Sequence, residues 1–160
     1  GPVSGVYSFV GLAIIGNIIV FMKIEKFSGT DPQLYKLVAP LVMSPGILRQ
    51  NNNYPFKTSI HHIWFVTTEN NTVQGFIPVE IKAHNVTIDN YYISGDNAKL
   101  LSQMIDKVVT TFGEDYPIYS VTHTRHVNIF QEKGFSPVKE WKLYVKMEWK
   151  GDENNPKECI

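Results

Sequence analysis

The sequence predicts an α+β domain with a mixed, mostly antiparallel sheet flanked by helices. Three strand-like runs, residues 59–69, 73–83 and 86–94, follow one another with short polar turns between them, as in an antiparallel meander. A strongly helical pattern over residues 95–113 then precedes a further strand, which favours a crossover between parallel strands. The 160 residues, 43% of them hydrophobic, suffice for one domain with a sizeable core.

The segment before the meander predicts one strand and two short helices. Residues 22–27 alternate charged and apolar side chains, which is typical of a half-buried strand. A turn then leads into a helix with Pro32 at its first position, and its apolar residues recur at helical spacing. Because Pro40 and Pro45 shorten or kink that helix, we expect a second short helix over residues 44–50.

The segment after the meander predicts a long helix, a strand, a short helix and a terminal strand region. Asp96 or Asn97 can cap the long helix, and Gly113 can end it. Its apolar stripe consists of Leu100, Leu101, Met104, Ile105, Val108 and Phe112. Beyond it we expect a strand over 116–123 and a helix over 125–134, and residues 135–149 form either one bent strand or two.

Residues 1–21 form an apolar leader ahead of the domain. Its 16 uncharged residues, 6–21, fall short of the roughly 20 that span a bilayer as a helix, and no signal-peptide features accompany them. Because the chain opens on Gly-Pro and Met22 resembles a natural start, our first interpretation is an extension that derives from expression or is encoded upstream of the natural start. A genuine extra strand or helix and a membrane anchor stay open, although we expect no stable anchor. If the leader is ordered, another surface must bury its apolar side chains, and a second copy of the chain in a homodimer would supply that surface.

Composition narrows the class of protein. We expect one domain over residues 22–150 and a polar tail over 151–160. Fifteen basic residues balance fifteen acidic ones, so the sequence indicates no nucleic-acid groove. Cys159 is the only cysteine, which excludes an intramolecular disulfide and favours a cytoplasmic location. His123 and His126 lack the further ligands of a metal site, so we expect no metal.

The element order, read with the stretch IFQEKGF at 129–135 ahead of a last strand rich in Tyr, Met and Trp, resembles the GNAT superfamily of N-acetyltransferases over roughly residues 22–149. The resemblance implies that the fourth strand splays from the fifth and that acetyl-CoA binds in the gap as a co-substrate. It places pantetheine along the fourth strand and pyrophosphate at the start of the long helix, where free N–H groups suit an anion. The cofactor-binding residues implied are Tyr92, Ile93, Ser94, Gly95, Asp96, Asn97 and Ala98.

Two departures from the family pattern stand out. The pyrophosphate loop is degenerate, because the pattern Q/R-x-x-G-x-G/A has no match here and Asp96 adds a negative charge. Four residues before Gly134, where many members carry a tyrosine that protonates the leaving thiolate, this chain has Phe130. A phenyl ring cannot give a proton.

The resemblance, with the titratable residues nearby, yields the candidate site. The catalytic candidates are His123, Tyr91 and Glu80, and Asp89 and Tyr92 are further candidates for the base. The candidates for acceptor binding are Arg49, Tyr54 and Phe56. The expected function is transfer of an acetyl group from acetyl-CoA to a primary amine, on a small molecule or a protein. The alternative is a catalytically inactive GNAT-fold protein that binds a ligand or partner.

Overall fold

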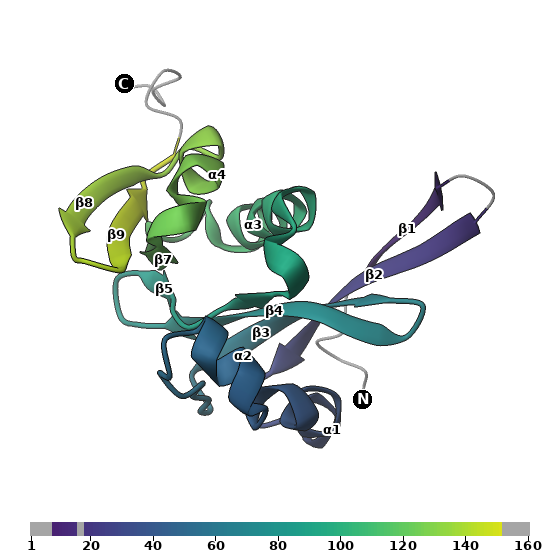
Figure 1. Ribbon diagram of the computed structural model, residues 1–160. Coiled ribbons are helices and arrows are strands. Elements are labelled where there is room, and N and C mark those ends of the chain that lie inside the picture. The colour runs from purple at the N-terminus through teal and green to yellow at the C-terminus, as the bar shows by residue number, and fades with distance from the viewer. Residues whose placement is uncertain (1–7, 16–17, 152–160) are drawn as a thin grey trace.

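The computed structural model of the chain describes residues 8–15 and 18–151. Its strands are β1 Ser8–Ile15, β2 Ile18–Ser28, β3 His62–Glu69, β4 Thr72–Ile81, β5 Val86–Ile88, β6 Tyr92–Ile93, β7 Ile118–His123, β8 Ser136–Glu140 and β9 Tyr144–Trp149. Its helices are α1 Pro32–Val42, α2 Pro45–Gln50, α3 Ala98–Phe112 and α4 Val127–Glu132, with short 3₁₀ turns at Ser94–Asp96 and Thr124–His126. The strands form one sheet in the order β1-β2-β3-β4-β5-β7-β9-β8, and β6 also pairs with β4 (Figure 1).

The sheet is antiparallel except at one central pair of strands. β2, β3, β4 and β5 form an antiparallel meander, as predicted. β5 and β7 run parallel, with Val86 opposite Ile118 and Ile88 opposite Ser120. A tight turn cannot join parallel strands, so α3 supplies the connection between them. The predicted α+β class with a mixed, mostly antiparallel sheet is confirmed.

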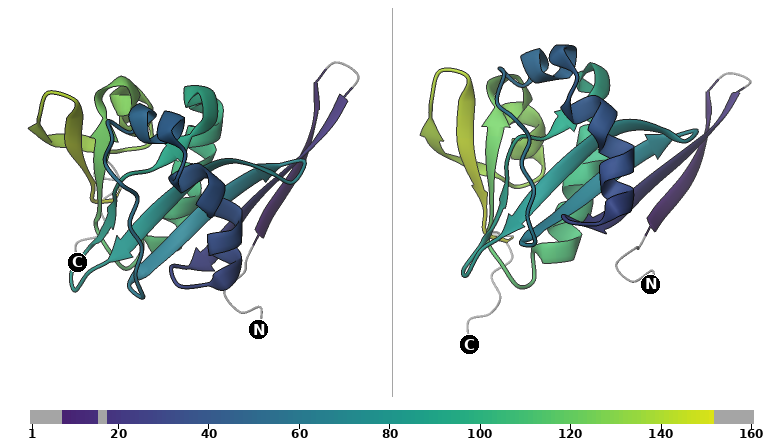
Figure 2. Two further views of the ribbon diagram at one scale, coloured as in Figure 1. Left: turned by 60° about the horizontal axis from the view of Figure 1, so that its bottom comes forward. Right: turned by 90° about the horizontal axis from the view of Figure 1, so that it is seen from below.

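Helices cover both faces of the sheet. α3 and α4 lie on one face, and α1 and α2 lie on the other (Figures 1 and 2). The larger core gathers beneath α3 and α4 and includes Phe65, Ile105 and Phe130. A smaller core beneath α1 includes Leu34 and Trp64. Burial of these apolar side chains holds the helices against the sheet.

The ends of α3 follow the chemistry that the sequence predicts. The side chain of Asn97 accepts the Leu100 backbone N–H at 3.1 Å, so Asn97 rather than Asp96 is the cap. At the other end, the Gly113 N–H donates to the Val109 carbonyl at 2.7 Å. The buried stripe is the predicted one: Leu100, Leu101, Met104, Ile105, Val108 and Phe112.

The prediction of one continuous strand over residues 86–94 is wrong. The strand is interrupted at 89–91, so β5 pairs with one end of β4 and β6 with its other part. Asn90 adopts a left-handed φ of 49°, which an extended strand does not contain. Its side-chain amide donates to the Pro55 carbonyl at 2.9 Å and fixes this conformation. The interruption carries the chain away from β7.

Other boundaries are refined by the structure. Residues 135–149 form two strands, β8 and β9, joined as an antiparallel hairpin. The strand predicted over 22–27 extends back to Ile18 as β2. All of β1, from Ser8 to Ile15, pairs with residues 18–25 of β2. The β1–β2 hairpin projects from the edge of the sheet (Figures 1 and 2). Residues 1–7 and 16–17 of the leader, and residues 152–160 of the tail, lie outside the described residues.

None of the helices in the described part of the chain is long and apolar enough to cross a membrane.

Candidate active site

The central parallel strands come apart toward one end. β5 pairs with β7 only as far as Ser120, whereas β7 continues to His123. Past β5 the chain turns toward β4, where β6 pairs with Gly75 and Phe76. We call the space between residues 89–93 and residues 121–123 the strand gap. It corresponds to the splayed strands that the resemblance implies.

The side chain of Tyr91 crosses the strand gap. Tyr91 is only 2% exposed, and its ring centroid lies 5.8 Å from that of Phe130. Its hydroxyl oxygen accepts the His123 backbone N–H at 3.3 Å and lies 2.6 Å from Nδ1 of His126. Burial raises the pKa of Tyr91 despite the hydrogen bond from His123. The phenol therefore keeps its proton and donates it to His126.

His126 connects Tyr91 to Asp96. Nε2 of this buried imidazole lies 2.9 Å from Oδ1 of Asp96. Burial, together with the charge of Arg125, lowers the pKa of His126, although Asp96 opposes the shift. A neutral ring that accepts from Tyr91 at Nδ1 and donates to Asp96 from Nε2 satisfies both hydrogen bonds. The three side chains thus form one continuous hydrogen-bonded row.

Arg125 neutralises Asp96 beside the start of α3. Its Nε donates to both carboxylate oxygens of Asp96 at 3.1 Å, and its guanidinium donates to the Gln50 carbonyl at 3.4 Å. Partial burial opposes ionisation of Asp96, but hydrogen bonds from Arg125 and His126 prevail and lower its pKa. Neighbouring Gly95 has a φ of 62°, and no atom lies within 4 Å of where its side chain would begin.

The strand gap is closed in this conformation. Its free volume is about 10 Å³, roughly the space of one water-sized probe. The Ile93 carbonyl, one of the groups that the resemblance assigns to pantetheine, accepts a hydrogen bond from Nε2 of Gln50 at 3.2 Å. Side chains of the chain itself therefore fill the strand gap.

His123 ends β7 beside the strand gap. It is 2% exposed, and its ring centroid lies 4.9 Å from that of Tyr144. Its Nδ1 has no hydrogen-bond partner among the described residues. Burial, reinforced by Arg125 and His126, lowers the pKa of His123 to about 4. The imidazole is therefore neutral at neutral pH and holds no second proton to donate.

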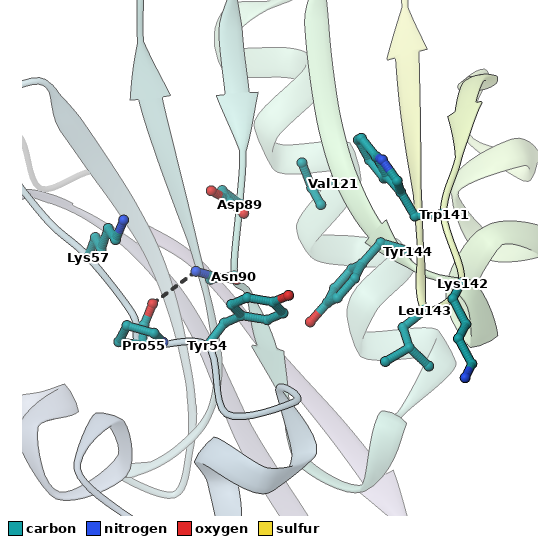
Figure 3. A pocket seen from close by; sticks show the side chains of 10 residues that line it. All are labelled: Tyr54, Pro55, Lys57, Asp89, Asn90, Val121, Trp141, Lys142, Leu143 and Tyr144. Atoms are coloured by element: carbon teal, nitrogen blue, oxygen red, sulfur yellow. Dashed lines mark hydrogen bonds between the residues drawn. The ribbon is translucent and has the colours of Figure 1, made fainter.

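An open cavity of about 580 Å³ lies on the other side of Tyr144. Four segments form it: the loop after α2, the break between β5 and β6, β7, and the turn of the β8–β9 hairpin. The side chains of Tyr54, Trp141 and Tyr144 and the carboxylate of Asp89 surround it (Figure 3). The ring of Tyr144 packs on His123, so the open cavity and the strand gap share a wall.

The asparagine run before Tyr54 fixes the loop that lines the open cavity. Asn52 and Asn53 have left-handed φ angles of 54° and 64°, which asparagine tolerates better than most residues. Nδ2 of Asn52 donates to the Tyr144 hydroxyl at 3.0 Å, which ties the loop to the β8–β9 hairpin. Nδ2 of Asn51 donates to the Tyr54 carbonyl at 2.9 Å. The run is therefore a structural anchor for the cavity wall.

Asp89 is the carboxylate of the open cavity. It lies at the break between β5 and β6, next to the strand gap. Asp89 is exposed toward the cavity, but the surrounding protein removes part of its hydration, and this partial desolvation raises its pKa, while Lys57 opposes the shift. A carboxylate with a raised pKa is a better proton acceptor than an ordinary one. The sequence alone favours Glu80 over Asp89 as the base, because only the break in the strand places Asp89 on the cavity.

The structure separates the other residues predicted for the site. Glu80 pairs with His62 and Thr87 in the sheet and does not line the open cavity. Arg49 is exposed on α2, also outside the cavity wall. Phe56 and Tyr92 both pack against Phe76 in the smaller core, with ring centroids 5.0 and 5.5 Å away. Of the three predicted acceptor residues, only Tyr54 lines the open cavity.

Trp141 and Leu143 in the hairpin turn line the cavity and were missed as site residues. Both side chains are exposed apolar groups in a turn between strands, and this was the available signal. Within residues 8–15 and 18–151, no three His, Cys, Asp or Glu side chains gather into a group that could hold a metal ion.

Comparison with known proteins identifies the fold. No protein-family model and no curated protein matches the sequence. Among solved structures, Escherichia coli ElaA superposes with a TM-score of 0.61 and 16% identity over 79% of this chain and 98% of its own. An acyl-CoA N-acyltransferase from Pseudomonas aeruginosa gives a TM-score of 0.59 and 12% identity over 80% of this chain and 99% of its own.

A GNAT family acetyltransferase from Elizabethkingia anophelis, solved with acetyl-CoA bound, gives a TM-score of 0.54 and 13% identity over 80% of this chain and 97% of its own. These identities are low, so the likeness concerns the fold. The chain has the GNAT fold, as the element order predicted.

Proposed function

We propose that this GNAT-fold chain is an acyltransferase that moves an acetyl group from acetyl-CoA to a primary amine. The observation that carries the proposal is the divergence of β5 and β7 beside an open cavity that holds the Asp89 carboxylate. The donor would lie in the strand gap and the amine would enter from the open cavity. Solved neighbours with acetyl-CoA or coenzyme A bound support this assignment.

The donor would be held by the segment from β6 to the start of α3. On this proposal Tyr92 and Ile93 lie beside pantetheine, and residues 94–98 surround the pyrophosphate. The positive end of the 15-residue helix α3 and the open space at Gly95 favour an anion there. Arg125 would pass from Asp96 to a phosphate oxygen, since a guanidinium binds carboxylates and phosphates with similar geometry.

Entry of the donor requires the Tyr91 side chain to leave the strand gap. This movement breaks the hydrogen bonds of Tyr91 with His126 and with the His123 N–H. Each such bond contributes about 0.5–1.5 kcal/mol net, and exposing the buried ring costs about 1.5–3 kcal/mol more, so a bound donor must supply several kcal/mol of contacts.

The reaction makes one bond and breaks one. The amine nitrogen attacks the thioester carbonyl carbon, an N–C bond forms, and the C–S bond breaks with its electron pair staying on sulfur. Asp89 passes the first proton of the ammonium to solvent, which frees the nitrogen lone pair for attack, and it accepts the second proton once the N–C bond has formed, because desolvation raises its pKa. We assign proton donation to Tyr91, because it is a phenol beside the strand gap and a phenol keeps its proton at neutral pH, whether buried or displaced toward solvent. Phe130 has no such proton, and His123 is neutral.

A second candidate function is that of a binding protein without catalysis. The observation that favours it is the closed strand gap, filled by Tyr91 and lined by the Asp96–Arg125 ion pair. On this reading the open cavity binds a ligand and no acyl donor ever enters.

Release of the coenzyme A thiol separates the two functions. Purified protein is incubated with acetyl-CoA and a panel of primary amines, free thiol is followed spectrophotometrically, and the N-acetyl product is identified by mass spectrometry. The acyltransferase proposal predicts amine-dependent thiol release that falls by about 10²-fold or more in Asp89→Asn. Thiol release that is absent with every amine, from protein shown to be folded, would support the binding protein instead.

A further inference from the structure

The open cavity has one apolar wall and one charged wall. Tyr54, Trp141 and Tyr144 supply three aromatic rings, and Val121 and Leu143 add aliphatic surface (Figure 3). The Tyr54 and Tyr144 rings meet edge to face with centroids 5.9 Å apart. Such a wall favours a ligand with an aromatic or similarly bulky apolar body.

The hairpin that carries Trp141 is fixed in place. The backbone N–H of Trp141 donates to the Tyr144 carbonyl at 2.8 Å, which closes the turn between β8 and β9. The Thr124 N–H donates to the Leu143 carbonyl at 3.1 Å, which ties the turn to the end of β7. Trp141 is nevertheless 46% exposed, although Nζ of Lys139 lies 5.2 Å from the centroid of its ring. An exposed aromatic ring on a fixed turn is prepared to cover a ligand, because little ordering is required on binding.

The charged wall suits a single ammonium group. Asp89 stands across the cavity from Trp141 (Figure 3). Lys57 acts on the Asp89 carboxylate through its charge, but no cationic side chain of the described residues forms a direct ion pair with it, so a ligand ammonium can make that contact. Lys57 and Lys142 also border the cavity and repel any cation, and the repulsion grows with each further positive charge on the ligand. Contact with Asp89 can offset it for one ammonium but not for several.

We propose that the acceptor is a monoamine with an aromatic or comparably bulky apolar body, whose ammonium contacts Asp89 and whose body packs against Trp141, Tyr54 and Tyr144. This inference deepens the proposed function and rests on it, because it takes the open cavity to be the acceptor site. Linear polyamines and short alkylamines are disfavoured, the former by the two lysines and the latter by the unfilled aromatic wall.

Ligand binding without any acyl donor tests the inference independently of catalysis. 2-Phenylethylamine, ethylamine and spermidine are titrated into the full chain at neutral pH, with binding followed by calorimetry and by ligand-observed NMR. We expect 2-phenylethylamine to bind at least tenfold more tightly than the other two amines. Spermidine or ethylamine binding as tightly as 2-phenylethylamine would overturn the proposal.

Variants connect the binding to the two walls. Asp89→Asn and Trp141→Ala should each weaken 2-phenylethylamine about tenfold or more. Their matched controls, Asp106→Asn on α3 and Ile60→Ala in the loop before β3, change exposed residues outside the open cavity and should leave affinity unchanged. Equal affinity in wild type, Asp89→Asn and Trp141→Ala would refute the assignment of the walls.

The outcomes also distinguish this inference from the proposed function. Selective binding of 2-phenylethylamine without acetylation would contradict the acyltransferase and leave the ligand class standing. Acetylation of spermidine in preference to 2-phenylethylamine would confirm the acyltransferase and refute the ligand class.

Discussion

The hydroxyl oxygen of Tyr91 lies 2.6 Å from Nδ1 of His126, across the gap between two diverging strands. This contact joins the segment that leaves β5 to the turn that follows β7. Because the Tyr91 side chain fills the gap, its contacts help to hold the gap closed, and on the proposed function it also has to move before an acyl donor can enter.

Tyr91→Phe removes the hydroxyl and keeps the ring. His126 Nδ1 and the His123 N–H would then be buried without partners, so we expect a loss of about 1–3 kcal/mol in the free energy of unfolding. Urea denaturation followed by circular dichroism measures the change. Tyr35→Phe, at an exposed tyrosine on α1, is the matched control and should stay within about 0.5 kcal/mol of wild type. Wild-type stability in Tyr91→Phe would mean that the contact contributes nothing.

Asp89→Asn removes the proposed base, and Glu80→Gln removes the carboxylate that the sequence suggested first. We expect amine acetylation to fall by about 10²-fold or more in Asp89→Asn and to change little in Glu80→Gln, because only Asp89 lines the open cavity. Steady-state turnover at saturating acetyl-CoA measures both variants. The reverse order of effects would return the role of base to Glu80.

His123 should make stability depend on pH. Its pKa of about 4 in the folded chain lies below the value of about 6.5 for an unfolded histidine, so the unfolded chain takes up the proton first. The contribution of His123 is therefore fully present above about pH 6.5. It is lost as the pH falls toward about 4, by an amount on the order of 3 kcal/mol.

Urea unfolding at several pH values between these limits tests the contribution of His123. His123→Gln should flatten the decline in stability relative to wild type, whereas His84→Gln, at an exposed histidine, should preserve it. An equal decline in all three proteins would rule out His123 as its source.

Asp96→Asn should favour the acyl donor. It removes a negative charge from the loop before α3 and frees Arg125 for phosphate, so we expect acetyl-CoA to bind several-fold more tightly. Arg125→Ala should weaken the same binding. Both changes should shrink as salt is added, since Asp96 and Arg125 are each 41% exposed. Titrations at low and high salt give the comparison, and unchanged affinity in both variants would place the phosphates elsewhere.

Local patterns in the sequence were sufficient to predict most of the fold. The α3 stripe, its cap at Asn97 and the polar turns of the meander each depend on near neighbours in the chain, and they lie where predicted. The break at Asn90 does not depend on near neighbours, because a hydrogen bond to Pro55, 35 residues away, fixes it. Reading residues 86–94 as one strand therefore missed the turn that exposes Asp89 to the cavity.

The site was harder to predict than the fold for the same reason. The row from Tyr91 through His126 to Asp96 joins residues 30 or more positions apart, and no spacing in the sequence indicates it. In the sequence, Asp96 looks like an excess negative charge in the pyrophosphate loop, whereas in the structure it pairs with Arg125 and His126. The cavity residues Trp141 and Tyr144 come from a β8–β9 hairpin, and the sequence leaves open whether residues 135–149 form one bent strand or two.

Calorimetric titration with acetyl-CoA of wild type and Tyr91→Ala tests the central claim most directly, which is that the strand gap is an acyl-donor site closed by Tyr91. We expect acetyl-CoA to bind weakly to wild type and at least tenfold more tightly to Tyr91→Ala, because the variant does not have to move a ring out of the gap. Folding of the variant is verified by circular dichroism. Absence of binding to both folded proteins at millimolar acetyl-CoA would contradict the claim.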